Sequence, residues 1–173
     1  MRWNWSGELD KTLSTLFVFP DNTVLCNFAA VNMLDVLKAV LNSGGRWAEA
    51  VAYEAQRSSR YIPVLRDVLD ADSWLGEPIE IADPAHVERV ERVRRTVFGG
   101  GDDKPLQHLG EAQTCFLIAE SGRFNGSSWV SDDRESLRYA RFQGISARET
   151  IDLMGAAVLH GELTAEDAFD AMR

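Results

Sequence analysis

The chain has 173 residues, of which 45% are apolar and 26% are charged. These values are typical of one globular domain with an ordinary core, and they exclude a disordered or collagen-like chain. Acidic residues outnumber basic ones by 27 to 18, and the net charge of −9 argues against the long-range attraction to phosphate that many nucleic-acid binders use. A nuclease is not excluded, because an acidic pocket can meet a polyanion through divalent cations.

The apolar segments of the chain are short. The longest, residues 16–19 and 115–119, fall well below the roughly 18 residues of a membrane-spanning helix. The first eight residues contain no apolar core of a secretory signal. Cys26 and Cys115 lie within apolar segments, where buried thiols are expected rather than a disulfide. We therefore expect a soluble cytoplasmic protein with no membrane partner.

The first predicted element is a buried strand over residues 16–19, an aromatic and aliphatic run that Pro20 stops. The polar residues Asp21, Asn22 and Thr23 follow as a turn. Thr23 is a favourable N-cap residue, and apolar residues at helical spacing come directly after it. We therefore expect a helix to begin at Thr23.

Helices are predicted for most of residues 24–69. Apolar periodicity over residues 24–41 indicates two helices, which the glycine-containing segment 43–45 ends. A third helix is predicted over residues 48–56, with Glu54 at the edge of its buried face. A short amphipathic helix is predicted over residues 61–69.

The middle of the chain begins with residues 77–81, whose alternation of polar and apolar side chains predicts a short strand. Asp83 and Pro84 then open a helix that extends to about residue 97. We interpret its charged face as solvated surface stabilised by neighbouring charge pairs. The alternative is a substrate-facing arm, because this face holds four arginines within seven residues: Arg89, Arg92, Arg94 and Arg95.

The C-terminal half follows a glycine-rich segment at residues 99–105, which we predict to be a flexible loop. A buried helix over residues 110–120 and a strand over residues 128–130 come next, and Asp132 and Asp133 open a further helix. Two more helix starts are predicted from pairs of capping residues, Ser146 with Glu149 and Thr164 with Asp167, and Gly161 is expected to end the first of these helices.

Short apolar strands that alternate with helices are typical of a parallel sheet covered on both faces. We therefore predict an α/β fold, a three-layer α/β/α sandwich with a small, mostly parallel central sheet. The whole chain, residues 1–173, is expected to be one domain. It includes a short N-terminal extension over residues 1–14 and the flexible glycine-rich loop near residues 99–105.

Acidic residues follow both predicted apolar strands. Ligand sites in α/β sheets lie beyond the carboxyl ends of the strands, where we place Asp21, Asp132 and Asp133, and we expect Glu54 and Glu111 to point to the same end. Converging carboxylates repel by roughly 4 kcal/mol per pair at about 4 Å, so they must take up protons or cations. Oxygen ligands without histidine or thiolate favour Mg²⁺ or Mn²⁺.

A simpler interpretation stays open for each acid taken alone. Asp21 and Asp133 are ordinary turn or cap residues, Glu111 complements a helix dipole, and Glu54 is a solvated side chain. Other chemistries have less support. The histidines, His86, His108 and His160, are dispersed, and neither a serine-nucleophile motif nor a phosphate-binding loop occurs.

Four segments together resemble the PIN domain family. Residues 17–25, Phe-Val-Phe-Pro-Asp-Asn-Thr-Val-Leu, resemble its first strand and metal-binding aspartate. Residues 109–112, Leu-Gly-Glu-Ala, resemble its central helix start, and residues 130–134 with the later Ala140 resemble its late strand and aspartate pair. Residues 51–54 lie where the family places its second acid.

This resemblance implies a Mg²⁺- or Mn²⁺-dependent endoribonuclease for single-stranded RNA, most often the toxin of a bacterial toxin–antitoxin pair of the VapC type. Its partners would be RNA, an antitoxin protein and a second copy in a homodimer. The implied catalytic residues are Asp21, Glu111 and Asp133, and the implied metal ligands are Asp21, Glu54, Glu111, Asp132 and Asp133. Thr23 and Ser131 would support these ligands. We also consider weaker substrate contacts from Arg92, Arg95 and Arg134.

A second hypothesis comes from a different functional class. The PIN-like fold would serve as a catalytically weak or inactive binding module, whose acidic pocket receives an arginine or lysine from a partner protein. The net charge of −9 suits a basic partner, and a basic side chain relieves carboxylate repulsion as a metal does. A small α/β domain whose acids are helix caps is the third alternative.

Overall fold

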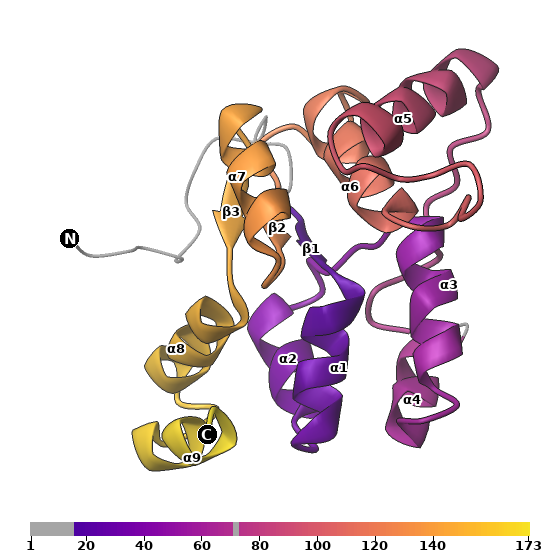
Figure 1. Ribbon diagram of the computed structural model, residues 1–173. Helices are drawn as coiled ribbons and strands as arrows, with labels where there is room; N and C mark the ends of the chain where they lie inside the picture. The colour runs from indigo at the N-terminus through magenta and orange to yellow at the C-terminus, as the bar shows by residue number, and fades with distance from the viewer. Residues whose placement is uncertain (1–15, 71–72) are drawn as a thin grey trace.

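A computed structural model describes residues 16–70 and 73–173 of the chain (Figure 1). The predicted N-terminal extension over residues 1–14 lies outside the described residues. Within the described residues, no helix has the length and apolarity needed to cross a membrane. Both cysteines are free thiols, as expected; Cys115 is buried, and burial raises its pKa to about 12, whereas Cys26 is only partly buried.

Three parallel strands form the sheet of the described residues, in the order β1 (Val18–Pro20), β2 (Ser128–Val130) and β3 (Ser146–Arg148). Phe19 on β1 lies opposite Trp129 on β2, and each is 1% exposed. Side chains this well buried explain why β1 and β2 read as apolar runs in the sequence. The predicted α/β class with a small parallel sheet is confirmed.

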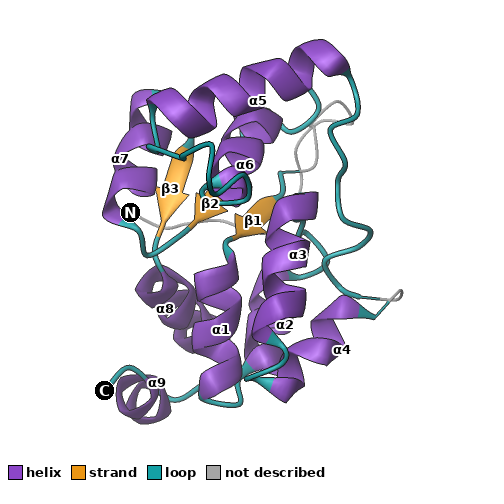
Figure 2. Ribbon diagram, turned by 45° about the vertical axis from the view of Figure 1, so that its right-hand side comes forward, coloured by secondary structure: helices purple, strands orange, loops and turns teal. Residues whose placement is uncertain are grey.

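The described residues form α-helices of different lengths and one short 3₁₀ turn. Their bounds are α1 (Asn22–Ala30), α2 (Leu34–Leu41), α3 (Glu49–Ser58), a 3₁₀ turn η1 (Pro63–Leu65), α4 (Arg66–Leu69), α5 (Pro84–Thr96), α6 (Leu109–Ala119), α7 (Arg134–Phe142), α8 (Thr150–His160) and α9 (Ala165–Ala171). Figure 2 shows α5, α6 and α7 around one end of the strands and α1, α2, α3 and α8 toward the other. This arrangement is compatible with the predicted three-layer sandwich.

Several predicted helix boundaries are confirmed. Asp83 caps α5, because its Oδ1 accepts hydrogen bonds from the backbone N–H groups of Ala85 at 2.9 Å and His86 at 3.1 Å. Thr164 caps α9 in the same way through the N–H of Asp167 at 3.0 Å. Gly161 ends α8 with a φ of 79°, a left-handed conformation that favours glycine.

Other predicted elements differ from the structure. The capping box of α8 joins Glu149 to Asp152, and Ser146 belongs to β3. Residues 77–81 form no strand; Ile79 makes one isolated bridge with Ala48. Ser146–Arg148 is a polar segment that pairs, whereas residues 77–81 alternate as a strand would and do not, so tertiary backbone contacts decide whether such segments pair as strands.

Two further boundaries near β1 also shift. Leu16 is 62% exposed and lies outside the strand, which begins at Val18. Thr23 lies inside α1, and Asp21 takes the N-cap position.

In the predicted helix over residues 61–69, Pro63 begins a 3₁₀ turn before the short α4, since proline is tolerated only in a first turn.

The glycine-rich segment is held by a buried arginine rather than left free. Arg94 is 1% exposed, although the sequence places it on a charged surface. It forms a bidentate pair with Glu91, with two nitrogen–oxygen distances of 2.7 Å. It also donates hydrogen bonds to the carbonyl oxygens of Gly101, Lys104 and Gln107 at 3.2 to 3.3 Å. The segment after α5 is therefore fixed to that helix.

The remaining arginines of α5 are engaged in surface ion pairs. Arg92 pairs with Glu88 at 3.0 Å. Arg95 pairs with Glu91 at 2.5 Å and with Asp102 at 2.6 Å. These contacts agree with the interpretation of a solvated, paired surface and give no support to a substrate-facing arm. Arg134, the third arginine considered for substrate, is an exposed residue at the start of α7.

Candidate functional site

Asp21 lies directly after β1, where the sheet ends. Its backbone N–H donates to the carbonyl of Val130 at 2.8 Å, which joins the ends of β1 and β2. Its side chain is buried, and Oδ2 accepts a hydrogen bond from the Thr23 hydroxyl at 2.7 Å. Burial raises the pKa of Asp21, and the charge of Glu111 raises it further, against the lowering by the Thr23 bond.

Glu54 is the second acid of the site whose pKa is raised. It lies on α3, and its Oε1 is close to Gly110 in the first turn of α6. Burial raises the pKa of Glu54 to about 8, with further increases from the charges of Asp21 and Glu111 and a decrease from Arg57. In the absence of a cation, Glu54 is therefore mostly protonated at neutral pH.

Glu111 completes the group from the first turn of α6. Its Oε1 lies 3.1 Å from Nδ1 of His108. Asp21, Glu54 and Glu111 come from three separate elements, and each pair among them interacts electrostatically. The structure thus brings these three predicted site residues into one electrostatic environment at the carboxyl end of β1.

Asp132 and Asp133 follow β2, but their carboxylates have other partners. Asp132 accepts hydrogen bonds from the backbone N–H of Thr150 at 2.8 Å, the Thr150 hydroxyl at 2.5 Å and the Asn27 amide at 2.8 Å. Asp133 caps α7 through Ser136 N–H at 2.7 Å. The cap role that the sequence left open for Asp133 is therefore present in the structure.

The hydroxyl of Ser131 has a local role. Its Oγ accepts a hydrogen bond from the backbone N–H of Asp133 at 3.2 Å. Ser131 is fully buried at the end of β2, so it fixes the backbone that carries the two aspartates. Thr23 and Ser131 thus each contact an aspartate of the predicted site.

The acids suit a divalent cation in their donor chemistry but not in their spacing. Asp21, Glu54 and Glu111 offer only oxygen donors, which suit a hard divalent cation. Among residues 16–70 and 73–173, no three histidine, cysteine, aspartate or glutamate side chains are placed so that they could hold a metal ion. The donor set therefore fits Mg²⁺ or Mn²⁺ in chemistry, and the side chains would have to move closer together around an ion.

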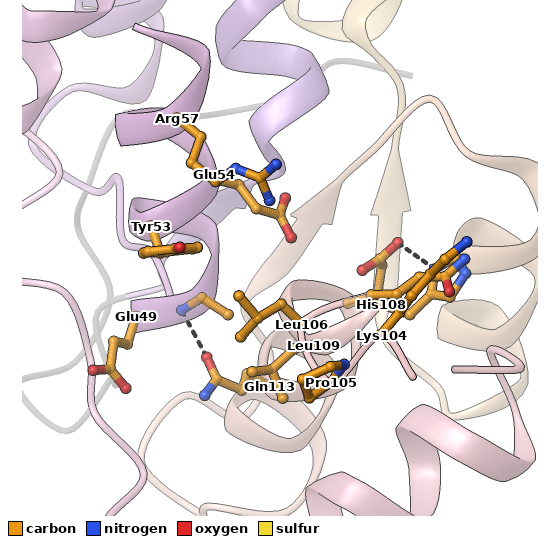
Figure 3. A pocket seen from close by; sticks show the side chains of 13 residues that line it. Glu49, Tyr53, Glu54, Arg57, Lys104, Pro105, Leu106, His108, Leu109 and Gln113 are labelled. Carbon is orange, nitrogen blue, oxygen red and sulfur yellow. Dashed lines mark hydrogen bonds and ion pairs between the residues drawn. The ribbon is translucent and has the colours of Figure 1, made fainter. Parts of the chain in front are cut away.

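A pocket of about 740 Å³ opens beside these acids, between α3 and the segment that leads into α6. Figure 3 shows its side chains, which come from both walls. The charged and polar lining comprises the acids Glu49, Glu54 and Glu111, the basic residues Arg57, Lys104 and His108, and the amides Gln107 and Gln113. The apolar and aromatic lining comprises Ala50, Tyr53, Pro105, Leu106 and Leu109. Since Arg94 holds the segment at Lys104 and Gln107, it also fixes one wall of this pocket.

Several of these lining residues were not predicted from the sequence. His108 belongs to no metal-binding motif in the sequence, but it lies three residues before Glu111. This spacing brings side chains together at a helix start. Its φ of 61° is unusual for a non-glycine residue and turns the chain into α6. Tyr53 and Arg57 carried a weaker signal, their proximity to Glu54 on α3.

Comparisons with protein-family models, with curated proteins and with solved structures find no match for this chain.

Proposed function

We propose that this protein is a Mg²⁺- or Mn²⁺-dependent endoribonuclease that acts on single-stranded RNA and has the three-layer architecture of a PIN domain. The observation that carries the proposal is the electrostatic coupling of Asp21, Glu54 and Glu111, which come together from β1, α3 and α6. The pKa values of Asp21 and Glu54 are both raised, and neighbouring acids with raised pKa values are typical of sites that bind cations or carry out catalysis.

In this proposal Asp21, Glu54 and Glu111 hold the metal. A bound ion would polarise the scissile phosphate and lower the pKa of an attacking water. The protein side chains orient the ligands: Thr23 holds Asp21 through its hydroxyl, and His108 contacts Glu111. Asp133 uses Oδ1 to cap α7, and we retain its Oδ2 as a proposed ligand.

In this proposal Asp132 has a structural role. Its carboxylate joins the start of α8 to α1 through Thr150 and Asn27. It thereby fixes the end of β2, next to the proposed metal ligands. We also propose that this protein is the toxin of a toxin–antitoxin pair with a basic antitoxin. We further propose that it forms a homodimer.

Substitution of Asp21 tests the nuclease. We expect Asp21→Asn to abolish Mg²⁺-dependent cleavage of a single-stranded RNA while thermal unfolding stays cooperative, because the amide cannot supply the anionic ligand. Asp35→Asn is the matched control, since Asp35 is exposed on α2 and outside the pocket. Cleavage by Asp21→Asn at the rate of the unsubstituted protein would reject the assignment.

A second candidate function is a binding module for a basic protein segment. The described acids are not spaced as metal ligands, and apolar side chains such as Tyr53 and Leu109 line the pocket beside Glu54. The alkyl stem of a lysine or arginine could pack on that apolar wall while its charge meets Glu54. This function needs no metal.

A Mn²⁺ titration followed by the melting temperature separates the two functions. A ligand that binds only the native state raises the melting temperature. Stabilisation by Mn²⁺ without any partner, lost in Asp21→Asn, favours the nuclease. No stabilisation by Mn²⁺, together with stabilisation by a lysine-rich peptide, favours the binding module.

A further inference from the structure

We propose that two adjoining pockets on either side of Glu54 and Arg57 bind consecutive bases of a single nucleic-acid strand, with Tyr53 and Tyr61 as the stacking rings. This inference rests on the proposed nuclease function and specifies how the substrate lies across the site. It is carried by the geometry of the two pockets, the exposure of the two rings and the distribution of basic side chains.

The two pockets share part of their walls. The first is the pocket of about 740 Å³ described above. The second has a volume of about 320 Å³ and is lined by Asn22, Glu54, Arg57, Ser58, Arg60 and Tyr61. Because Glu54 and Arg57 line both, the pockets meet at the carboxyl group that we assign to the metal. A nucleic-acid strand that crosses from one pocket to the other must pass this carboxyl group.

Each pocket contains one solvent-accessible tyrosine ring. Tyr53 on α3 is 45% exposed and lines the first pocket, and Tyr61 just after α3 is 87% exposed and lines the second. Leu106, which is 44% exposed, adds an apolar surface to the first pocket from the opposite wall. Proteins that bind single strands use such exposed rings as stacking platforms for bases.

Basic side chains accompany the rings. Arg57 lines both pockets, Lys104 lines the first and Arg60 lines the second. None of these three takes part in the ion pairs found among the described residues. Glu49, Glu54 and Glu111 line the same pockets, and Arg57 interacts electrostatically with Glu54, so the basic side chains balance the acids there and let a phosphate approach the site in a chain of net charge −9. Because Arg57 lines both pockets, it would meet a phosphate that links bases bound in the two.

The first pocket also offers a hydrogen-bond donor to a base. Oε1 of Gln113 accepts the backbone N–H of Ala50 at 2.9 Å, which fixes the orientation of the amide. The Nε2 group is then the part of Gln113 that can donate to a base carbonyl. A lysine or arginine of a basic peptide would meet Glu54, as in the second candidate function, but it would also lie beside Arg57, Arg60 and Lys104.

The experiment measures the affinity for a fluorescently labelled, single-stranded ten-nucleotide RNA in EDTA, where the proposed nuclease cannot cleave. We expect Tyr53→Ala and Tyr61→Ala each to weaken binding by about tenfold, and the double variant by about a hundredfold. Tyr53→Phe and Tyr61→Phe should bind as the unsubstituted protein does, because phenylalanine retains the stacking surface. Phe142→Ala is the control, an 82% exposed ring on α7 outside both pockets.

An RNA with two adjacent abasic nucleotides tests base stacking directly. It should bind the unsubstituted protein more weakly than the intact RNA does, and this difference should disappear in the double tyrosine variant. The inference is overturned if the two alanine variants bind within twofold of the unsubstituted protein. It is also overturned if a lysine-rich peptide, and not RNA, binds in a manner that needs Tyr53 and Tyr61.

Cleavage assays in Mg²⁺ separate this inference from the nuclease proposal. We expect the tyrosine variants to raise KM with little change in kcat, whereas Asp21→Asn removes kcat. Cleavage that depends on Asp21 but has an unchanged KM in both tyrosine variants rejects the base pockets and leaves the nuclease in place. Cleavage that is independent of Asp21 rejects the assignment of the metal site, whatever the tyrosine variants do.

Discussion

Glu54 on α3 packs against Gly110 on α6 so closely that a Cβ atom on Gly110 would lie 3.2 Å from Glu54 Oε1. The same Cβ would lie 3.1 Å from Cγ2 of Val51. Both distances are shorter than ordinary van der Waals contact. The absence of a side chain at Gly110 therefore lets α3 and α6 approach and brings Glu54 and Glu111 into the same pocket.

Gly110→Ala is expected to impair the site. The added methyl group has to displace Glu54 or Val51, so Mn²⁺ should stabilise this variant less than the unsubstituted protein. Gly155→Ala on α8 is the matched control, because beyond the neighbouring backbone of its own helix no atom lies within 4 Å of the added Cβ. It should raise the melting temperature by about 3 °C through helix propensity. Equal behaviour of the two variants would contradict the packing argument.

The pH dependence of stability should reflect Glu54. Its pKa is about 8 in the folded state, above the ordinary value of 4.5, and the pKa of Asp21 is also raised. The folded state therefore binds protons more tightly than the unfolded state. This stabilisation is complete below the unfolded pKa and is lost as the pH rises toward 8.

Glu54→Gln removes the charge and should flatten this decline. Relative to the unsubstituted protein, we expect the variant to gain roughly 3 kcal/mol in the free energy of unfolding between pH 5 and pH 8.5 in EDTA, or about 9 °C in melting temperature. Glu49→Gln on the same helix is the control, because Glu49 is exposed. Parallel pH profiles for the Glu54→Gln variant and the unsubstituted protein would show that Glu54 ionises normally.

Arg94→Met should be strongly destabilising. The substitution leaves the carbonyl groups of Gly101, Lys104 and Gln107 without their donor and breaks a pair with a buried guanidinium. We expect a loss of about 3 kcal/mol in the free energy of unfolding, measured by urea denaturation. For Arg95→Met, whose side chain is half exposed, the expected loss is below about 1 kcal/mol. Similar losses in both variants would mean that the buried contacts of Arg94 contribute little.

The two aspartates after β2 can be separated by substitution. Asp132→Ala removes the acceptor for Thr150 and Asn27 and should cost about 2 kcal/mol in the free energy of unfolding. Asp133→Ala removes the cap of α7 and should cost about 1 kcal/mol. A neutral Asp132→Ala would show that α8 begins independently of this carboxylate.

Asp133→Ser distinguishes the cap from a metal ligand. Serine is a good N-cap residue, so the variant should keep its stability. If Asp133 also binds metal, the stabilisation by Mn²⁺ should nevertheless decrease. Unchanged stabilisation by Mn²⁺ would limit Asp133 to the cap of α7.

Local sequence patterns determined much of the secondary structure. The apolar runs predicted β1 and β2, and the capping residues Asp83, Asp133 and Thr164 predicted where three helices begin. These features depend on contacts between residues a few positions apart. Physical rules of short range are therefore enough to predict them.

Other features depended on contacts between distant residues. β3 has a polar sequence and forms because its backbone pairs with β2. Arg94 looks like a surface residue in the sequence, and its burial follows from the carbonyl groups of a later segment. His108 has no motif around it, and only the turn into α6 brings it to Glu111.

The candidate site follows the same division. The sequence by itself determined that acids follow β1 and β2 and that others lie on α3 and α6. Only the tertiary structure decided that Asp21, Glu54 and Glu111 share one electrostatic environment while Asp132 and Asp133 bind backbone groups. The reason is that helix packing, above all the close approach at Gly110, sets the distances between side chains that are remote in the chain.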